Sequence, residues 1–374
     1  MATKSICILS GIYPPDSGGP ANFALTFSNF LLEKEFEVSV KTYTDGNTFH
    51  ANQGDLDVKA ISRKNSILIR YIQMVLEILR EAKKGSYIIA NGCFIEIALA
   101  RLVYNFNYFT KVPGDIVWER AQTMGRTSKS IEEFQEEILS TKNQIFRKLF
   151  NRSLKKSRKV IVPSPQLATL CERWGVDKTK IAVIRNSVDT DKFKPENVVE
   201  HTYDFVTVCR LVPWKGVDQI IKCVKELEAS LLIIGDGPER NHLELLAADS
   251  TNAIDFVGDI SRERVLVELR KCKVFVLNSN YEATSYALLE AMACGLPGIA
   301  NGNTGSVEII THQIDGLLCG SKTSLNLLEA MQALFSNQEL RVSMAESAQK
   351  KVKTDFAMHT NFGQILEVVT NAKK

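Results

Sequence analysis

Short β-rich segments alternate with helix-like segments along the whole chain, and this alternation restricts the possible folds more than any other feature. SICILSG (residues 5–11) and KVFVLNS (273–279) are two of the strand-like runs. Apolar residues at helical spacing mark 22–33, 68–83 and 262–271. Strands separated by helices build parallel sheets that are covered on both faces. We therefore predict an α/β protein with doubly wound sheets.

The alternation restarts near the middle of the chain. A first set of strands ends near residue 185, and a new set opens at Tyr203. The join, residues 186–202, is polar and includes a proline, as expected of a linker between domains. A chain of 374 residues is also too long for one ordinary hydrophobic core. We predict two Rossmann-like domains, residues 1–194 and 195–355.

Composition disfavours several classes of protein. No apolar run reaches the roughly 18–20 residues that span a bilayer, and the N-terminus lacks the features of a signal peptide. Eight cysteines are scattered without a CxxC pair, which is typical of reduced thiols in a cytoplasmic protein. Two Asp-x-Asp patterns, Asp55–Asp57 and Asp189–Asp191, could hold a divalent metal. We place the first in a polar loop and the second in the linker, and predict no metal site.

Positive charge is concentrated in the N-terminal half. Residues 1–194 contain 29 Lys and Arg against 20 Asp and Glu, whereas the remainder contains 17 against 23. The segment 142–159 has eight Lys and Arg, no acid, and apolar residues at helical spacing. It is either a solvated amphipathic helix packed on its own domain or a contact for anionic lipid or an acidic acceptor. We expect no nucleic acid as a partner.

The strongest functional motif is YEATSYALLEAMACGLPGIANGNTGSVE, residues 281–308. Glu282 and Glu290 lie eight positions apart in it, after a strand-like run and around the start of an apolar helix. Ligands of α/β sheets bind outside the carboxyl ends of the strands, and the N–H groups at a helix N-terminus bind phosphate. A carboxylate on either side can hold the hydroxyls of a sugar and of a ribose. The motif therefore indicates a phosphate ester that carries sugars.

Two cations follow another strand-like run, in CRLVPWKG. Arg210 and Lys215 could neutralise a diphosphate and stabilise it as a leaving group, or they could be ordinary surface charges on a loop. A position opposite the loop of Glu282 and Glu290 favours the first interpretation.

Two glycine-rich turns are weaker signals. Gly18 and Gly19 precede a helix in GIYPPDSGGPANF and could let backbone amides approach a ligand, although many strand–helix turns are rich in glycine. Gly237, in GDGPER, belongs to a near match to the dinucleotide-binding fingerprint, but Arg240 replaces its third glycine. A dinucleotide-dependent oxidoreductase is therefore disfavoured.

Together these motifs resemble the retaining, GT-B-fold nucleotide-sugar glycosyltransferases of the group-4 type, which include lipopolysaccharide and capsule enzymes. The resemblance covers most of the chain, through YPPDSGG, VPSP, IRNSVDTDKF, CRLVPWKG, LLIIGDGPER, FVGDI and EATSYALLEAMACGLPGIANGNTGSVEII. The last segment has the family's E-x7-E spacing. The resemblance implies two Rossmann-like domains that face each other across a cleft. It also implies that a C-terminal helix, residues 356–374, crosses back to the N-terminal domain.

The resemblance further implies roles for individual residues. Arg210 and Lys215 match the diphosphate-binding pair, and Glu290 matches the ribose ligand. Glu282 matches the residue that holds hydroxyls of the donor sugar. Glycines and backbone groups are expected to complete the donor site, with Val257 and Gly258 beside the base: Gly18, Gly19, Gly237, Val257, Gly258, Thr284, Ser285 and Tyr286.

The chain departs from the family pattern in its N-terminal half. Many relatives have a histidine there, on a loop that faces the donor sugar. The corresponding segment here is KVPGDIVWERA, with Asp115 near that place. Asp115 is therefore a candidate catalytic residue that contacts the donor sugar or the acceptor. Trp118, Glu119 and Arg120 either line the acceptor side or pack within the domain.

The activity implied by the resemblance is a metal-independent sugar transfer with retention of configuration. The donor would be a nucleoside diphosphate sugar, with uridine favoured, and the acceptor a hydroxyl of a glycan or lipid-linked glycan in cell-envelope synthesis. No cofactor besides the donor substrate is expected, and the expected location is cytoplasmic, at the inner face of the cell membrane. The alternatives are a nucleotide-sugar epimerase of the same fold and a non-catalytic nucleotide-sugar-binding protein.

Overall fold

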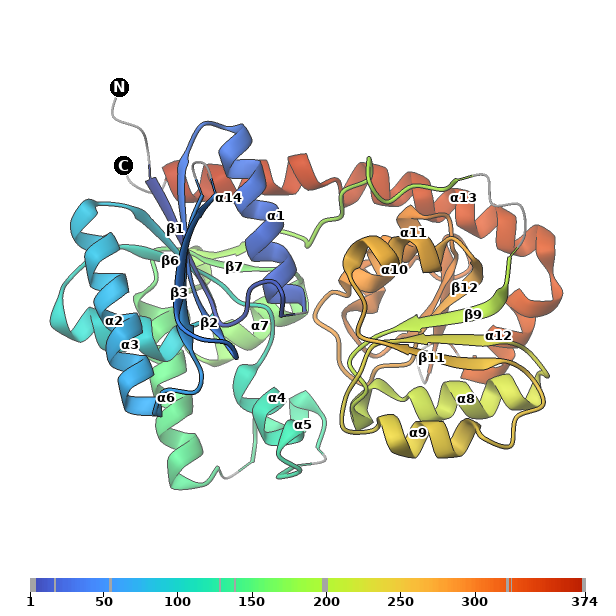
Figure 1. Cartoon of the computed structure of the whole chain (residues 1–374). Coiled ribbons are helices and arrows are strands. Elements are labelled where there is room, and N and C mark those ends of the chain that lie inside the picture. The colour runs from blue at the N-terminus through green and yellow to red at the C-terminus, as the bar shows by residue number, and fades with distance from the viewer. Residues whose placement is uncertain are drawn as a thin grey trace. The chain divides into compact units, whose positions relative to one another are not determined.

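The computed structural model describes residues 5–16, 18–53, 56–127, 129–137, 139–196, 201–320, 323 and 325–371. The chain forms two compact units (Figure 1). The N-terminal unit consists of Met1–Ile184 and Phe362–Lys374, and the C-terminal unit of Arg185–Asn361. Each unit has its own sheet with helices on both faces, as the alternation of segments predicts.

The sheet of the N-terminal unit has the order β3-β4-β2-β1-β5-β6-β7-β8. All neighbours pair in parallel except β3 and β4, which only two residues separate, too few for the crossover that parallel strands need. The strands are β1 Ser5–Ser10, β2 Glu37–Thr44, β3 Phe49–Gln53, β4 Leu56–Ser62, β5 Tyr87–Asn91, β6 Tyr108–Lys111, β7 Val160–Val162 and β8 Ile181–Val183.

Helices cover both faces of this sheet, with α1 on one side and α2, α3 and α6 on the other (Figure 1). The sequence signals for α2 are clear, because Ser66 caps its first turn by accepting from the N–H of Ile69 and Gly85 ends it at φ 79°. The helices are α1 Gly19–Glu33, α2 Ile67–Lys84, α3 Phe94–Val103, α4 Ile116–Thr123, α5 Ile131–Phe134, α6 Thr141–Lys156 and α7 Pro165–Arg173, with a 3₁₀ turn η1 Lys178–Lys180.

The last helix, α14 Met358–Asn371, supplies residues to both units, since the boundary between them falls after Asn361. In the N-terminal unit Phe362 is buried against three phenylalanines of α1. Its ring centroid lies 5.8, 5.1 and 5.6 Å from those of Phe23, Phe27 and Phe30. Edge-on aromatic contacts of this kind stabilise the packing of α14 on α1.

The sheet of the C-terminal unit is entirely parallel, with the order β11-β10-β9-β12-β13-β14. This is the strand order of dinucleotide-binding sheets. The first three strands are added toward one side of the sheet and the next three toward the other, so the strand order reverses between the first and the fourth strand. The strands are β9 Tyr203–Val208, β10 Leu231–Ile234, β11 Ile254–Gly258, β12 Cys272–Leu277, β13 Gly298–Asn301 and β14 Gly316–Cys319.

Alternate residues of these strands point into two separate apolar cores. Phe275 and Leu277 pack with the helices α10, α11 and α13, whereas Val274 and Val276 pack with α8, α9 and α12. The helices and 3₁₀ turns are η2 Pro213–Lys215, α8 Val217–Glu226, α9 Arg240–Ala247, α10 Arg262–Leu269, α11 Tyr286–Ala293, η3 Gly305–Glu308, α12 Leu327–Ser336 and α13 Gln338–Asp355.

The boundary between the units lies at Ile184 and Arg185, ten residues before the boundary that the sequence predicts. The segment after Arg185 is polar, but Val188 and Phe193 are buried in a core of the C-terminal unit. At the other end Phe356 belongs to the same core, so the return to the N-terminal unit begins at Phe362 and not at residue 356.

Candidate functional site

The predicted donor residues of the C-terminal unit gather at the carboxyl edge of its sheet. Strands β9 and β12 are neighbours, yet the loops that follow them lead to α8 and α11 on opposite faces. Ligands of open α/β sheets bind at such a point of reversal.

Lys215 and Glu282 form an ion pair between these two loops. The Lys215 ammonium donates to Oε1 of Glu282, and the Ser279 hydroxyl donates to the same oxygen at 3.0 Å. The turn into α8 uses Gly216 at φ 62°, where a Cβ would lie 2.6 Å from the carbonyl oxygen of Asn278. Only glycine permits this approach, so the two loops are held together at the backbone as well as by charge.

Arg210 projects from the same edge, directly after β9. Its side chain is exposed, and it forms no ion pair with the described part of the chain. Lys215, in contrast, is already engaged by a carboxylate. An anionic ligand could therefore pair with Arg210 directly, whereas it would have to displace the Glu282 carboxylate from Lys215.

The loop that carries Glu282 is fixed from several sides. The N–H of Gly305 donates to the carbonyl oxygen of Glu282 at 2.7 Å, and the Asn186 amide donates to that of Thr284 at 3.2 Å. A Cβ on Gly305 would lie 2.1 Å from the carbonyl oxygen of Ala283. These contacts give the Glu282 carboxylate a defined position, which is what specific recognition of sugar hydroxyls needs.

Helix α11 begins directly after this loop. The hydroxyl of Ser285 accepts from the N–H of Leu288 at 3.3 Å and caps the first turn. The first N–H groups of a helix have no partner within the helix, so this end attracts anions. The Tyr286 hydroxyl donates to Oδ1 of Asn186 at 3.1 Å, and burial raises the pKa of Tyr286.

Glu290 lies in the middle of α11 and is almost completely buried. Its Oε1 accepts from the guanidinium of Arg262, which lies over the Phe193 ring at 5.1 Å from the centroid. Burial raises the pKa of Glu290, and the positive charge of Arg262 partly opposes this effect. Arg262 thus fixes the buried carboxyl group at a position where it can accept hydrogen bonds from a ribose.

Three further predicted residues lie at the same edge of the sheet. Val257 and Gly258 end β11, and the carbonyl oxygen of Gly258 accepts from the N–H of Gly235 at 2.8 Å. Gly237 follows β10, where a Cβ would lie 2.2 Å from the carbonyl oxygen of Leu211. The structure therefore groups these residues beside Arg210 and Lys215, while their roles as ligands stay predictions.

Gly18 and Gly19 belong to the N-terminal unit, where Gly18 precedes α1 and Gly19 is its first residue. Gly18 has φ 136°, a conformation that favours glycine, and its carbonyl oxygen accepts from the N–H of Asn22 at 3.0 Å. The turn thus has a backbone conformation that would let a ligand come close to the main chain.

Asp115 is part of a buried network and not of an open site. Its side chain has no exposed surface. Oδ1 accepts from the N–H groups of Val117 and Trp118 at 3.0 and 3.2 Å, which caps α4. Oδ2 accepts from Gln135 at 3.0 Å and pairs with Arg147 at 2.7 Å. The predicted contact with the donor sugar finds no support here, because both oxygens are already occupied.

The neighbours of Asp115 also serve packing. Trp118 is buried, with its indole N–H donating to the carbonyl oxygen of Lys129 at 3.0 Å. Arg120 lies over the Phe146 ring at 5.2 Å from the centroid. This favours the packing interpretation for Trp118 and Arg120, whereas Glu119 is half-buried at the start of the same helix.

In both Asp-x-Asp patterns an aspartate makes contacts within its own unit. Asp57 pairs with Lys41, and Asp55 lies outside the described residues. Asp189 accepts from the N–H groups of Asp191 and Lys192, both at 3.1 Å. Among the described residues no group of three His, Cys, Asp or Glu is placed to hold a metal ion.

Sequence reasoning missed Asn186 and Arg262, which position Thr284, Tyr286 and Glu290. In the sequence Asn186 stands in a polar linker, and Arg262 stands at the start of a helix. Their partners lie far away in the sequence, so no local pattern indicates the contacts.

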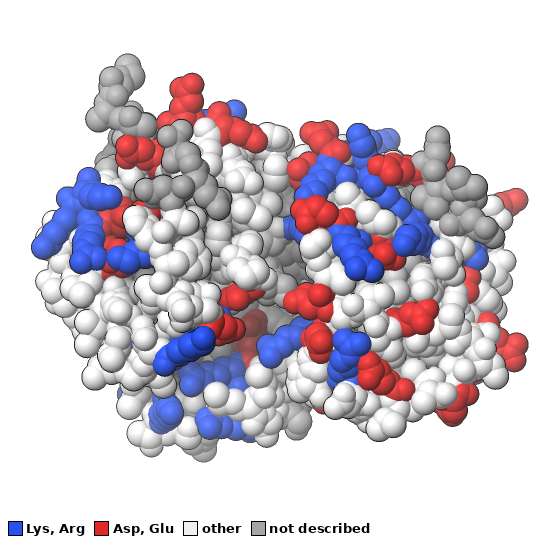
Figure 2. Space-filling model, viewed as in Figure 1, with Lys and Arg blue, Asp and Glu red and all other residues white. Residues whose placement is uncertain are grey.

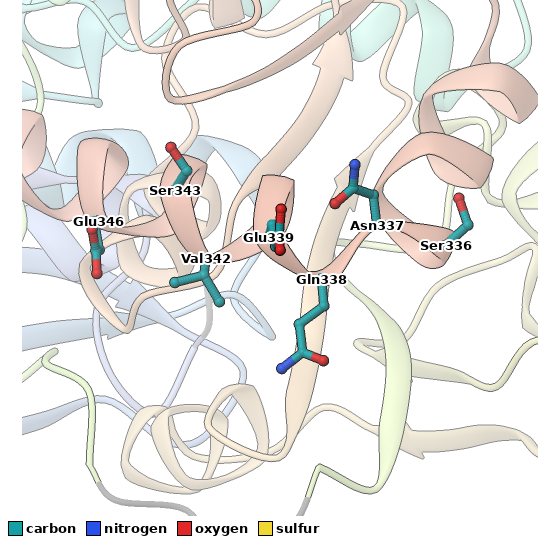
Figure 3. A pocket seen from close by; sticks show the side chains of 7 residues that line it. All are labelled: Ser336, Asn337, Gln338, Glu339, Val342, Ser343 and Glu346. Carbon is teal, nitrogen blue, oxygen red and sulfur yellow. The ribbon is translucent and has the colours of Figure 1, made fainter.

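One hollow lies away from this site, at the junction of α12 and α13 (Figure 3). Its volume is about 890 Å³, and its side chains point in different directions along the helix instead of converging. It contains none of the predicted ligands.

Two family models match consecutive parts of the chain. Residues 17–192 match Glycosyltransferase Family 4, and residues 188–351 match Glycosyl transferases group 1. The first match falls almost entirely within the N-terminal unit and the second within the C-terminal unit.

Individual relatives and structures agree with the family matches. A Campylobacter jejuni N,N'-diacetylbacillosaminyl-diphospho-undecaprenol alpha-1,3-N-acetylgalactosaminyltransferase is 24% identical over 54% of this chain and 58% of its own length. One subunit of the human phosphatidylinositol N-acetylglucosaminyltransferase is 24% identical over 94% of this chain and 73% of its own length. For most of the curated relatives that it matches, the chain spans about half their length.

A solved structure of Anabaena HepE with UDP and glucose superposes with a TM-score of 0.76, at 19% identity, over 98% of this chain and 100% of that one. At this identity the likeness concerns the fold, and that fold is GT-B. The chain belongs to the glycosyltransferases that join a Family 4 domain to a Glycosyl transferases group 1 domain.

Proposed function

We propose that this protein transfers a sugar from a nucleoside diphosphate sugar, with uridine favoured, to a hydroxyl of a glycan or lipid-linked acceptor. The observation that carries the proposal is the pairing of Lys215 with Glu282 at the reversal point of the C-terminal sheet. The pairing brings together a residue proposed to bind the diphosphate and a residue proposed to bind sugar hydroxyls, next to the start of α11.

The binding mode follows from the charges at this edge. Arg210, Lys215 and the first turn of α11 neutralise the diphosphate, and Glu290 holds the ribose. Glu282 exchanges Lys215 for hydroxyls of the donor sugar when the diphosphate arrives. The known structures that bind UDP and glucose, such as HepE, support uridine as the base.

The proposed reaction retains the anomeric configuration. The bond between the anomeric carbon and the β-phosphate oxygen breaks, and a bond to the acceptor oxygen forms on the same face of the sugar. The acceptor's proton passes to the leaving phosphate oxygen. Charge that develops on this phosphate is stabilised by Arg210 and Lys215, so the step needs no metal ion.

The acceptor is proposed to be part of a cell-envelope glycan. Support comes from the names of relatives, one of which acts on a diphospho-undecaprenol-linked sugar. No helix of the described chain is long and apolar enough to cross a bilayer. For a lipid-linked acceptor at the membrane surface, α6 is one candidate contact. It buries Phe150 and Leu154 against its own unit while its Lys and Arg side chains are largely exposed.

The site assignment is tested with Lys215→Ala and Glu290→Ala. Both variants are expected to lose transfer from a panel of UDP-, GDP- and ADP-sugars, and both should bind UDP more weakly by calorimetry. Lys222→Ala, which removes an exposed lysine of α8 paired with Asp218, is the matched control. Wild-type transfer by either site variant would show that the assignment is wrong.

Three further measurements separate the finer parts of the proposal. Activity that is lost in EDTA and restored by magnesium would contradict metal independence. The anomeric coupling of the product by NMR reports retention or inversion. An epimerised nucleotide sugar formed without an acceptor would indicate an epimerase. A protein that binds a UDP-sugar but neither transfers the sugar nor slowly hydrolyses the donor would be a non-catalytic binder.

A further inference from the structure

Helix α2 has an unusual distribution of side chains. Its inner face buries two carboxylates, those of Glu77 and Glu81, beside Met74 and Ile78. Its outer face exposes four large aliphatic side chains by 47–69%: Leu68, Ile69, Ile72 and Leu76. Ile67, the first residue of the helix, is also exposed. A surface helix normally does the reverse, with apolar residues inside and charges outside.

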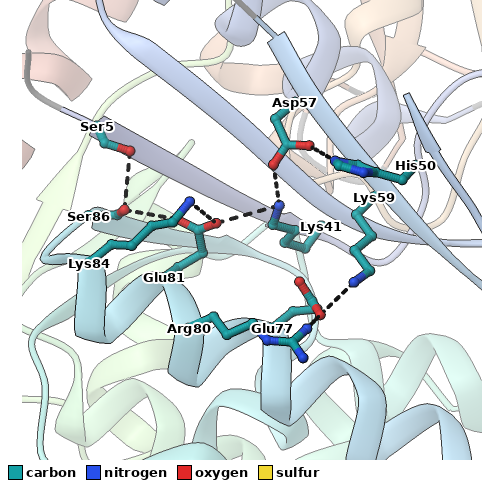
Figure 4. A network of polar contacts seen from close by, with 10 residues as sticks. All are labelled: Ser5, Lys41, His50, Asp57, Lys59, Glu77, Arg80, Glu81, Lys84 and Ser86. Carbon is teal, nitrogen blue, oxygen red and sulfur yellow. Dashed lines mark hydrogen bonds and ion pairs between the residues drawn. The ribbon is translucent and has the colours of Figure 1, made fainter. Parts of the chain in front are cut away.

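The polar inner face is explained by partners on the sheet (Figure 4). Lys59 of β4 lies 2.7 Å from Oε1 of Glu77, and Lys41 of β2 lies 3.5 Å from Oε1 of Glu81. The Ser86 hydroxyl donates to Oε2 of Glu81 at 2.8 Å. The buried charges are thus compensated within the unit, whereas nothing in the described part of the unit covers the aliphatic outer face.

The outer face is also purely basic in its charged residues. Between residues 64 and 84 the exposed charged side chains are those of Lys64, Arg80, Lys83 and Lys84. Arg80 and Lys84 neutralise the two buried glutamates, whereas Lys64 and Lys83 form no ion pair within the described chain. Both acids of the helix point inward, so the exposed face combines aliphatic side chains with uncompensated positive charge.

This face begins at the carboxyl edge of the N-terminal sheet. Arg63, three residues before the capping Ser66, donates to the carbonyl oxygen of Gly11 at 2.8 Å, directly after β1. Helix α3 packs against both α2 and α6. Lys and Arg side chains gather where Figure 1 places α6 (Figure 2). The same unit thus has a basic region besides the aliphatic face of α2.

We propose that the outer face of α2 docks onto the surface of an anionic lipid bilayer. The aliphatic side chains from Leu68 to Leu76 would insert at the headgroup boundary, while Lys64 and Lys83 would contact acidic headgroups. A second copy of this chain is a poorer occupant, because two such faces would bring their lysines together. The docking does not depend on the proposed transfer, although it would place the carboxyl edge of this sheet near a lipid-linked acceptor.

The test uses flotation of the full chain with vesicles of phosphatidylcholine alone or mixed with phosphatidylglycerol. The wild type is expected to bind the mixed vesicles and to release them as salt is raised. Ile69→Ser combined with Ile72→Ser should lower the partition coefficient at least tenfold. The matched control combines Leu245→Ser with Val267→Ser, which removes two exposed aliphatics from the C-terminal unit and should leave binding unchanged.

A charge variant tests the electrostatic part separately. Lys64→Gln combined with Lys83→Gln should weaken binding to mixed vesicles and flatten its salt dependence. If the serine variant fails to fold, Ile72→Glu alone places one carboxylate in the aliphatic face and should reduce binding by a similar factor. UDP binding, measured for every variant, is expected to be unchanged and reports that the fold is intact.

Three results would overturn the proposal. The wild type could fail to bind phosphatidylglycerol vesicles. The serine variant could bind them as the wild type does, which would leave α6 as the contact. The wild type could be a dimer that the serine variant converts to a monomer, which would make a second copy the occupant. Absence of UDP binding by the wild type would instead refute the proposed donor site and leave the vesicle result standing.

Discussion

Glu282→Gln is expected to strengthen the binding of free UDP while it weakens sugar transfer. In the structure the Glu282 carboxylate engages the ammonium of Lys215, and both side chains are mostly buried, with exposed fractions of 14% and 17%. A diphosphate that binds Lys215 must displace this carboxylate and then remains close to a like charge. Glutamine removes the repulsion and keeps an oxygen that can accept from Ser279.

The size of the effect follows from Coulomb's law. Charges near a protein surface interact with an effective dielectric constant between about 20 and about 80. At about 6 Å and a value of about 40, one unit of repulsion is about 1.4 kcal/mol, or about tenfold in Kd. Transfer should fall about 10- to 100-fold, because a hydrogen bond to a charged group contributes about 1.5–3 kcal/mol.

Calorimetry with UDP at low and high salt measures the first effect, and kcat/KM with UDP-sugars measures the second. The control is Asp249→Asn, which makes the same change in net charge. Asp249 follows α9 at the opposite edge of the sheet, where it pairs with Lys225. If UDP bound Glu282→Gln as weakly as the wild type, or more weakly, Glu282 would not compete with the diphosphate for Lys215.

Glu290→Gln is expected to raise the melting temperature near neutral pH and to weaken UDP binding. Burial raises the pKa of the native Glu290 carboxyl above its ordinary 4.5. The contribution of Glu290 to the free energy of unfolding is therefore most favourable below about pH 4.5, where the carboxyl is protonated, and it is lost as the pH rises through the raised pKa. The melting temperatures of the two proteins should therefore converge in acid. Arg147→Ala should lower the free energy of unfolding by about 3–5 kcal/mol, because it leaves the buried Asp115 unpaired; a loss under about 1 kcal/mol in urea would contradict this. Gly305→Ala should weaken UDP binding, whereas Gly363→Ala, with open space around it in α14, should stabilise the fold by about 0.5–1 kcal/mol; equal UDP affinity of the two variants would refute the steric argument.

The parallel architecture is readable from the sequence because buried strands of α/β sheets are continuous apolar runs. KVFVLNS becomes β12 and SICILSG becomes β1 for this reason. Strand β4, LDVKAIS, gives no such signal, since Asp57 and Lys59 interrupt it. Their charges are matched by Lys41 and Glu77, which come from other elements. Only the folded chain shows that a charged segment can be an inner strand.

The donor side of the site follows from a topological rule, whereas the structural role of Asp115 does not follow from any pattern in the sequence. Carboxyl ends of parallel strands meet at one edge, so Lys215 and Glu282 could be expected to converge although 67 positions separate them. Asp115 has the same chemistry as a catalytic carboxylate. Its occupation by Arg147, 32 positions away, depends on how α6 packs, and local spacing does not contain that information.

The chain order of the two units has a consequence for synthesis on the ribosome. The C-terminal unit is one continuous segment, Arg185–Asn361, and can close as soon as that segment has emerged. The N-terminal unit precedes it in the chain, but it lacks Phe362 until the whole C-terminal unit has been translated. Until then the aromatic face of α1, formed by Phe23, Phe27 and Phe30, lacks the cover that α14 provides. Of the two units, the one that is translated earlier is thus the one that is completed later.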